Sequence, residues 1–424
     1  MYWRYGLLGL SLAFVSLPLY VTLPHHYASH HALSLESIGA LLLITRLADA
    51  AIDPWLGRWI DRTLQRGQTA AWRLACLAGG VMTMGFIALW FPPAAMQQPH
   101  SLLLWLGATL ALTCLGYSAL SILHQAWGSR WGGSAMQRTR VVAARELAAL
   151  VGVLVASTLP SMLGLSATSA ALVLALLMGI VTLKQTPLIS PHRTEALPRP
   201  PHAPPPQGLS NTAPWQSMPF LALLAVFIIN GMASAIPATL LPFFVQETLG
   251  APHWQPLFLV SYFLAAAAAM PLWMKLVRHW GLVRCWQLAM LGTVLTFGVV
   301  PWLGAGDTLA FWLVCVSSGI HLGADLAIPG ALLTGVIVQA GCGGQAEGRF
   351  LGWWTAAPKL NLALAAGLAL PLLAAAGFAQ GGPAVANQNA LAWTYGVLPC
   401  VLKLVSLAAL HHASQRFPAW KDPS

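Results

Sequence analysis

The sequence predicts an all-α integral membrane protein with twelve transmembrane helices in two six-helix bundles. Of its 424 residues, 57% are hydrophobic and 8% are charged, and the mean hydropathy is +0.69. A soluble protein of this length would need more polar surface. Apolar runs of about 20 residues, the length that crosses a bilayer, recur along the chain. Basic residues follow every second run.

The apolar runs define the twelve expected spans. The first run starts close to Met1 without a small-residue cleavage site, so we expect an uncleaved first helix. The run-length criterion places the span centres near residues 16, 46, 82, 112, 152, 175, 230, 264, 294, 323, 362 and 400.

The distribution of Lys and Arg predicts the orientation of the chain. These residues follow spans two, four, six, eight and ten and recur at the C-terminal end, whereas the other loops have essentially none. Basic loops stay in the cytoplasm, so both termini are expected there, on the inner side of the cell inner (plasma) membrane. This topology also explains the net charge of +10. Because the basic residues form no compact patch, we expect the lipid bilayer and a small solute as partners, and no nucleic acid.

A Pro-rich stretch divides the chain. Residues 185–216 interrupt the hydropathy pattern and are expected to form a cytoplasmic linker. It separates an N-terminal six-helix bundle, residues 1–184, from a C-terminal six-helix bundle, residues 217–424. Six spans on each side resemble the layout of the major facilitator fold, in which two parallel halves surround a central site.

Span two carries charged side chains inside its apolar run. Arg46, Asp49 and Asp53 are spaced by three and then four residues, so they line one face of a helix. An ionisable group at the bilayer centre costs about 2.5 to 3.5 kcal/mol on insertion scales, and such groups usually mark an ion or substrate path. The alternative is a structural Arg–carboxylate pair between helices, which explains one carboxylate better than two.

Two further intramembrane charges are Asp325 in span ten and Lys359 in span eleven. If these groups converge with the span-two residues, negative charge exceeds positive charge by one, and one bound cation would neutralise it. Two carboxylates one helical turn apart repel each other when both are ionised, which favours cation binding. Asp49, Asp53, Asp325 and Lys359 are therefore the candidate cation-coupling residues. Alternatively, Lys359 only holds the two bundles in register.

The span-two sequence resembles a known signature. The run from Arg46 to Gly57, RLADAAIDPWLG, followed by Asp61-Arg62-Thr63, is similar to the span-two motif of the glycoside-pentoside-hexuronide:cation symporter family, the melibiose permease-like transporters of the major facilitator superfamily. Tyr5-Gly6 and the segment from Gly352 to Gly367 fit the same pattern. The likeness is specific in span two and loose over the rest of the chain.

The resemblance implies roles for four residues. Asp49 and Asp53 match the cation-binding carboxylates, Arg46 matches the arginine that lines the sugar and cation cavity, and Lys359 matches the lysine that faces them. The coupling ion is thus H⁺ or Na⁺, and no other cofactor is implied.

Two departures from the family pattern narrow these expectations. The sugar-binding aspartate of span one falls on Ala13, so a galactoside specificity is not supported. An asparagine that helps to bind sodium falls on Ile52, which removes an oxygen ligand. Because hard cations need several oxygen ligands, a proton is favoured over sodium.

Polar side chains in the spans are candidate substrate ligands. Hydroxyl, imidazole and amide groups can hydrogen-bond a polar solute, and Trp rings can stack on it. Small polar residues also hold membrane helices together, which is the structural alternative. The predicted substrate-binding set is Arg46, Tyr117, Ser121, His124, Gln125, Asn230, Trp354 and Thr355.

A cytoplasmic gate is predicted after span two. The topology rule explains the arginines there, but it does not explain the acidic Asp61 among them. Carboxylate–arginine contacts at this place would hold the inner side closed. The predicted gate residues are Asp61, Arg62, Arg138 and Arg145.

Other function classes find no support in the sequence. It has no GxSxG, HExxH or P-loop pattern, so we expect no enzyme. No metal site is expected either, because the spacing of the outer-loop histidines, His25, His26, His30 and His31, suits solvated side chains better than converging ligands.

The sequence therefore predicts a monomeric secondary active transporter that couples a small polar solute, a sugar or glycoside, to a cation by alternating access. The alternative is a major facilitator exporter or carrier of a lipid or amphipathic compound, which the 19 Trp residues favour. The identity of the solute, proton against sodium, and symport against antiport stay open.

Overall fold

The computed structural model describes residues 2–19, 23, 26–27, 33, 35–96, 98–188, 213–375 and 391–420. This part of the chain is helical, with short turns between the helices. Eight stretches within it are long and apolar enough to cross a membrane. The prediction of an all-helical, multi-pass membrane protein is confirmed. Residues 189–212 of the predicted linker lie outside the described residues, as do His25, His30 and His31.

The residues group into two compact units. Unit 1 comprises Met1–Gly133, Arg140–Ser217 and Val336–Ala356, and unit 2 comprises Ser134–Thr139, Met218–Gly335 and Ala357–Ser424. The change from one unit to the other after Ser217 falls at the end of the predicted linker. Two short segments belong to a different unit from the residues on either side of them in the sequence. Residues 134–139 group with unit 2, and residues 336–356 group with unit 1. The second segment contains the first turns of span eleven.

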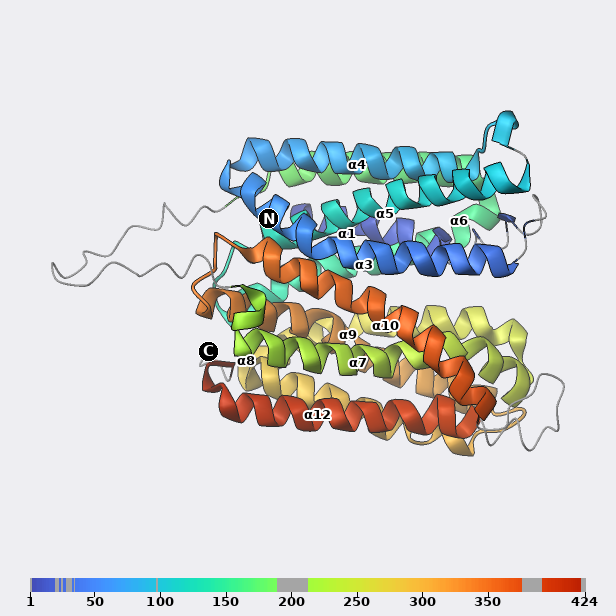
Figure 1. Ribbon diagram of the computed structural model, residues 1–424. Helices are drawn as coiled ribbons and strands as arrows, with labels where there is room; N and C mark the ends of the chain where they lie inside the picture. The colour runs from blue at the N-terminus through green and yellow to red at the C-terminus, as the bar shows by residue number, and fades with distance from the viewer. Residues whose placement is uncertain are drawn as a thin grey trace. The chain divides into compact units, whose positions relative to one another are not determined.

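Unit 1 is a bundle of long helices (Figure 1). Its helices are α1 (Tyr2–Leu17), α3 (Leu35–Gln65), α4 (Gln68–Trp90), α5 (Pro99–Ser129), most of α6 (Ala135–Lys184) and the first turns of α10 (Glu347–Ala375). α5 packs along both α4 and α3. Gly164, with φ of 81°, breaks α6 in two, because only glycine adopts this conformation without a steric cost.

Unit 2 contains the remaining helices. They are α7 (Met218–Phe243), α8 (Gln255–Phe297), α9 (Thr308–Gln339), the rest of α10, and α12 (Leu398–Arg416). α12 packs on α7 and α8. Gly281, with φ of 77°, breaks α8 as Gly164 breaks α6. Short helical turns join these elements in both units: η2 (Ala94–Met96), η5 (Pro214–Gln216), η6 (Phe244–Thr248), η7 (Pro252–Trp254), η8 (Val300–Trp302), η9 (Ala392–Val397) and η10 (Pro418–Trp420).

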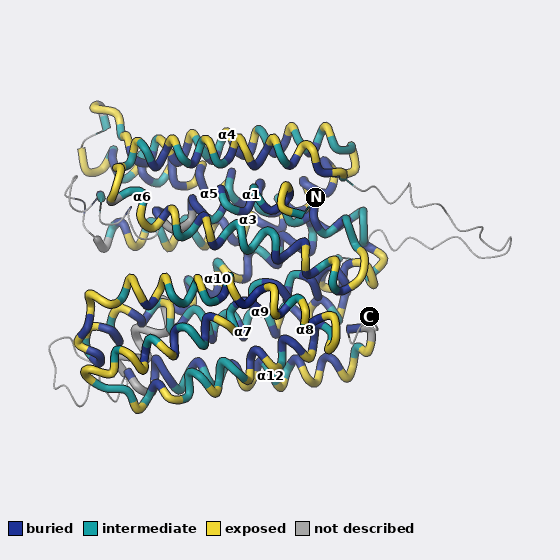
Figure 2. The backbone as a smooth tube through the Cα atoms, turned by 180° about the vertical axis from the view of Figure 1, so that it is seen from behind, coloured by how far each residue is buried: buried dark blue, intermediate teal, exposed yellow. Residues whose placement is uncertain are grey.

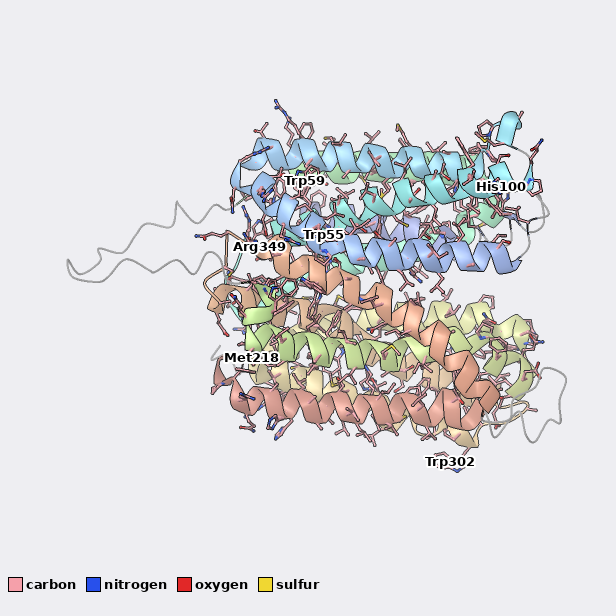
Figure 3. All side chains as sticks on the ribbon, viewed as in Figure 1. Trp55, Trp59, His100, Met218, Trp302 and Arg349 are labelled. Carbon is pink, nitrogen blue, oxygen red and sulfur yellow. The ribbon has the colours of Figure 1, made fainter. Side chains whose placement is uncertain are left out.

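The surface pattern of the helices suits a lipid environment. Figure 2 shows exposed positions recurring along α4 and α12. Many of them are large and apolar, such as Leu77 and Met84 on α4 and Leu404 on α12. Trp302 in η8 projects away from the helices (Figure 3), as suits a tryptophan at a membrane interface.

Candidate functional site

Helix α3 has a polar inner face and an apolar outer face. Asp49 and Asp53 are buried, and the side chain of Asp53 has no exposed area (0%). Large apolar side chains on the opposite face are exposed, among them Trp55 and Trp59, which Figure 3 labels. Residues three or four positions apart share a helix face, so the charges that the sequence aligned lie inside unit 1.

Each of these aspartates accepts a hydrogen bond from a hydroxyl group. Ser118 Oγ on α5 donates to Asp49 Oδ1 over 2.6 Å. Thr355 Oγ1 on α10 donates to Asp53 Oδ2 over 3.2 Å. A hydroxyl can donate to an ionised carboxylate or accept from a protonated carboxyl group, so both contacts tolerate either protonation state. Thr355, predicted as a substrate ligand, thus belongs to the carboxylate site.

Glycines allow α10 to approach α3 closely. A Cβ atom on Gly57 would overlap the backbone of Gly348, and one on Gly348 would overlap that of Gly57. A Cβ atom on Gly352 would lie 2.5 Å from the carbonyl oxygen of Asp53. Small residues at such crossings let helix backbones meet. This close approach brings Thr355 to Asp53.

Asp61 lies near the end of α3, beyond its apolar part, and binds the start of α10. Its carboxylate accepts hydrogen bonds from the backbone N–H groups of Gly348, over 2.6 Å, and Arg349, over 2.9 Å. The first N–H groups of a helix have no partner within the helix, and the helix dipole favours negative charge there. Burial raises the pKa of Asp61 to about 7, although the two backbone hydrogen bonds oppose this shift.

A buried ion pair lies beside this contact. Arg130 Nε at the end of α5 is 3.3 Å from Glu347 Oε2 at the start of α10, and Arg130 Nη1 donates to the carbonyl oxygen of Leu64 on α3. Burial raises the pKa of Glu347, and Arg130 opposes this shift. The sequence analysis missed both residues. The sequence contained a signal for Glu347, because this residue, like Asp61, is acidic at a place where the topology rule predicts Lys and Arg.

The other predicted gate residues have different surroundings. Arg62 is exposed, and Arg145 forms an ion pair with its neighbour Glu146, with 2.5 Å between Nη2 and Oε1. Arg138 belongs to unit 2, where its guanidinium group lies beside Gly335 of α9.

The predicted substrate residues of span four differ in their surroundings. His124 is fully buried, and its Nε2 lies 2.8 Å from the carbonyl oxygen of Tyr5 while the Tyr5 hydroxyl donates to the carbonyl oxygen of His124. These contacts join α1 to α5. Gln125 donates to Ser121 over 3.2 Å, and both are partly buried. The structure places the remaining members of this set as follows: Arg46 and Tyr117 are partly buried, and Trp354 is buried.

Unit 2 contains a second charged cluster. Lys403 Nζ on α12 lies 2.5 Å from Asp325 Oδ2 on α9 and donates to Asn230 Oδ1 on α7 over 2.6 Å. Trp286 Nε1 on α8 donates to the other oxygen of Asp325. Lys403 is only 2% exposed, although it was not among the predicted site residues. Asp325 and Asn230, predicted for coupling and for substrate binding, both contact this lysine. The pairing of Lys359 with Asp49 and Asp53 stays a prediction.

The comparison with protein families decides the class of protein. A family profile described as MFS/sugar transport protein matches residues 4–414. The chain belongs to this family. It is therefore a transporter of the major facilitator superfamily and not an enzyme. Among curated proteins, none matches the chain.

The fold of this MFS/sugar transport protein is similar to that of solved transporters. One is the crystal structure of a bacterial homologue of the iron transporter ferroportin in the outward-facing state, with a TM-score of 0.70, 14% identity, and coverage of 98% of this chain and 100% of that one. The same homologue with soaked iron has a TM-score of 0.71 and 13% identity and covers 100% of both chains. At this level of identity, the likeness shows the fold alone.

In this transporter, the two charged clusters are built for different chemistry. Asp49 and Asp53 each accept a hydrogen bond from a hydroxyl group on a neighbouring helix. Asp325 accepts hydrogen bonds from the ammonium group of Lys403 and from the indole of Trp286.

Proposed function

We propose that this transporter is a secondary symporter that couples a small polar solute, a sugar or glycoside, to the entry of a proton. The observation that carries the proposal is the buried pair Asp49 and Asp53 with hydroxyl partners on α5 and α10. Ionisable groups inside membrane helices usually mark an ion or substrate path. The span-two motif, which resembles that of the melibiose permease-like family, supports the same residues.

A proton suits this site better than sodium. Sodium, like other hard cations, needs several oxygen ligands around it. Ile52, where the family pattern has an asparagine, supplies no side-chain oxygen and is 38% exposed on the outer side of α3. A proton needs one carboxylate oxygen and a hydrogen-bond acceptor, which Asp49 with Ser118 or Asp53 with Thr355 provides. In the proposal, Lys359 neutralises the carboxylates when no proton is bound, and Arg46 binds the solute.

The twelve-span topology is part of the proposal. The eight apolar stretches of the described residues include α8 in a single stretch, which Gly281 divides into two segments. Helices α1, α3 and α10 complete the twelve, since the charged residues of α3, among them the buried Asp49 and Asp53, lower its mean hydropathy without preventing it from spanning. Both termini and the Asp61 end of α3 then lie on the cytoplasmic side of the inner membrane, and the transporter acts as a monomer.

The contacts of Asp61 and Arg130 with the start of α10 form the proposed cytoplasmic gate. They bind α10 to α3 and α5 through charged hydrogen bonds at a buried helix N-terminus. Release of these contacts would free α10 at this end. Because Thr355 lies two turns further along the same helix, movement of α10 would also change the surroundings of Asp53.

The test is uptake of a panel of sugars, glycosides and organic acids into proteoliposomes under imposed pH and sodium gradients. We expect one solute class to accumulate with an inward proton gradient and not with a sodium gradient alone. Asp53→Asn should abolish accumulation but retain solute exchange without a gradient, whereas Asp307→Asn, at an exposed loop position, should behave as the unmodified protein. Unchanged proton-driven accumulation in Asp53→Asn would reject the proposal.

A further inference from the structure

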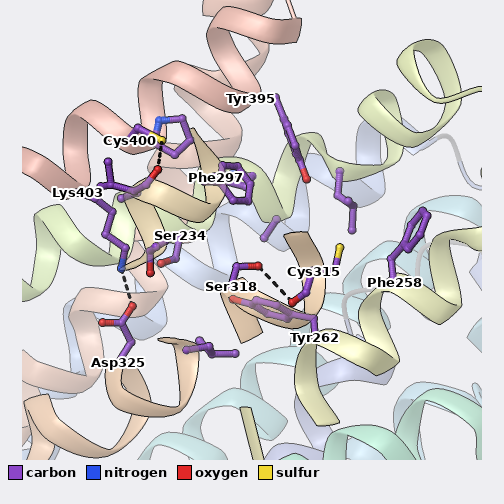
Figure 4. Close-up of a pocket in the computed structure, with 18 of the residues that line it drawn as sticks. Ser234, Phe258, Tyr262, Phe297, Cys315, Ser318, Asp325, Tyr395, Cys400 and Lys403 are labelled. Atoms are coloured by element: carbon purple, nitrogen blue, oxygen red, sulfur yellow. Dashed lines mark hydrogen bonds and ion pairs between the residues drawn. The ribbon is translucent and has the colours of Figure 1, made fainter. Parts of the chain in front are cut away.

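Unit 2 contains a cavity of about 150 Å³ that the proposed symport does not use. Residues of α7, α8, α9 and α12 line it, together with Tyr395 of η9. Figure 4 shows the Asp325–Lys403 pair at one end of the cavity and Phe258 toward the other, with Tyr262 and Tyr395 between them. The cavity therefore has a charged end and an aromatic body.

The aromatic body is a set of ring contacts. The rings of Phe297 and Tyr395 have centroids 5.5 Å apart, and those of Phe258 and Phe311 meet edge to face at 5.0 Å. Most of the other lining residues are aliphatic, among them Leu241 and Leu322. Aromatic walls favour a flat ring, which can stack on them or meet their edges.

The lining hydroxyls of Ser234, Thr293 and Ser318 donate to backbone carbonyl oxygens. Two further polar groups have a donor available to a ligand in this cavity. Tyr395 is 2% exposed, and its hydroxyl has no hydrogen-bond partner among the described residues; in Figure 4 it is directed into the cavity. Lys403 has three N–H groups, of which two donate to Asp325 and Asn230. The third can donate to a ligand oxygen. Since Asp325 balances the charge of Lys403, the polar end suits an uncharged group.

The volume of the cavity suits a ligand with one ring. A cavity of roughly 150 Å³ with apolar walls is large enough to bind benzene. A monosaccharide would bring several hydroxyl groups against these walls, and each one without a partner would oppose binding. One hydroxyl group can be satisfied by Lys403 or Tyr395.

We propose that unit 2 has a ligand site of its own in this cavity, which binds an uncharged single-ring compound with one hydroxyl group, of the phenol and aromatic alcohol class. The ring lies among Phe297, Tyr262 and Tyr395, and the ligand hydroxyl takes its hydrogen bond from Lys403 at the charged end or from the hydroxyl group of Tyr395. The site lies within unit 2, and it does not depend on the proposed symport.

The first test uses the full chain in lipid nanodiscs and phenol as the probe. Binding is measured by saturation-transfer NMR titration, with empty nanodiscs as the blank. Leu322→Phe, which fills the cavity from α9, should weaken phenol binding at least tenfold. The same substitution at Leu313, which is on α9 but 55% exposed, should not change it. Equal affinity of phenol for both variants, or no saturable binding to the unmodified chain, overturns the proposal.

A second variant tests the polar recognition. The ratio of the affinities for phenol and toluene reports the hydrogen bond to the ligand hydroxyl, and Tyr395→Phe should lower this ratio about threefold while toluene binding is kept. Asn230→Ala, which removes one hydrogen-bond partner of Lys403, is the companion variant. A phenol-to-toluene affinity ratio that is unchanged in both variants contradicts the predicted hydrogen bond to the ligand hydroxyl.

A third test, photolabelling, uses the unmodified chain, so its outcome does not depend on whether a variant folds. A phenol that carries a diazirine group is photolysed with the unmodified chain, and the labelled peptides are identified by mass spectrometry. Label on the peptides that contain Tyr262, Cys315 or Tyr395, reduced by excess phenol, supports the proposal. Label only at other places, or label that phenol does not reduce, overturns it.

Discussion

Unit 1 and unit 2 both hold carboxylates among their helices, and these carboxylates accept hydrogen bonds from different kinds of side chain. Asp49 and Asp53 of unit 1 accept hydrogen bonds from Ser118 and Thr355. Asp325 of unit 2 accepts hydrogen bonds from the ammonium group of Lys403 and the indole of Trp286. A hydroxyl serves a carboxyl group in either protonation state, whereas an ammonium group favours the ionised state alone.

From this difference we expect unit 1 to hold the site that exchanges an ion and the Asp325 cluster to hold helices of unit 2 together. Lys403, Asp325 and Asn230 join α12, α9 and α7 inside unit 2. Removing either member of such a pair leaves a buried charge, so the pair resists change. The predicted role of Asp325 in coupling can therefore be tested directly against that of Asp53.

The largest effect is expected on uptake, where variants of Asp53 and Asp325 should differ. Asp53→Asn should reduce proton-driven accumulation to the level of empty liposomes, because the amide cannot take up or release the coupled proton. The double variant Asp325→Asn/Lys403→Met, which removes both charges of this pair together, should still accumulate solute. If the double variant loses coupling and Asp53→Asn keeps it, the roles of the two units are reversed.

The next effect concerns stability. Lys403→Met alone should lower the free energy of unfolding by about 3 to 5 kcal/mol, because it leaves the Asp325 carboxylate, which is only 11% exposed, without its charged partner. The double variant Asp325→Asn/Lys403→Met should recover most of this loss. Denaturant unfolding in detergent, followed by tryptophan fluorescence, measures both. A single variant as stable as the double one would show that the ion pair does not hold unit 2 together.

A smaller, pH-dependent effect is expected at the start of α10. The buried Asp61 carboxyl has a pKa of about 7, against an ordinary value of 3.8 in water. At a pH between these two values, Asp61 is protonated while it is buried against α10 and ionised once it is exposed to water. The contact with α10 therefore weakens as the pH rises through this range. The equilibrium constant for release of the contact changes by up to about tenfold per pH unit, because one proton is involved.

Hydrogen exchange at the Gly348 and Arg349 amides, corrected for the intrinsic rates, measures this contact. Protection should fall between pH 5 and pH 7 within the window set by the Asp61 pKa of about 7. Glu347, Arg130 and Arg349 face the same carboxyl group, so Asp61→Asn is the control and should remove most of the pH dependence. The same pH dependence in Asp61→Asn would assign it to Glu347.

The smallest effect is expected from the hydroxyl partner of Asp49. Ser118→Ala removes one hydrogen bond and should lower the initial rate of uptake about fivefold, equivalent to about 1 kcal/mol. Ser406→Ala, at a buried serine of unit 2 that donates to the backbone of Val226, should leave the rate unchanged. Equal rates for both variants would mean that Ser118 only packs α5 against α3.

Local pattern was sufficient to predict much of this transporter. Hydropathy identified the membrane helices, because the length and polarity of a span are properties of one continuous segment. The helical period placed Asp49 and Asp53 on one face of α3, and that face proved to be the buried one. Glu347 and Lys403 were not among the predicted site residues, although each is a charge where composition predicts none.

The partners of these charges could not be read from the chain. Ser118 is 69 residues from Asp49, Thr355 is 302 from Asp53, and Gly348 is 287 from Asp61. Lys403 is 78 residues from Asp325. The period of a helix shows which of its residues share a face. Which helix packs against that face depends on the tertiary structure. Here, glycine contacts between α3 and α10 set that packing, and packing between helices determines whether a buried carboxylate meets a hydroxyl, an amide or an ammonium group.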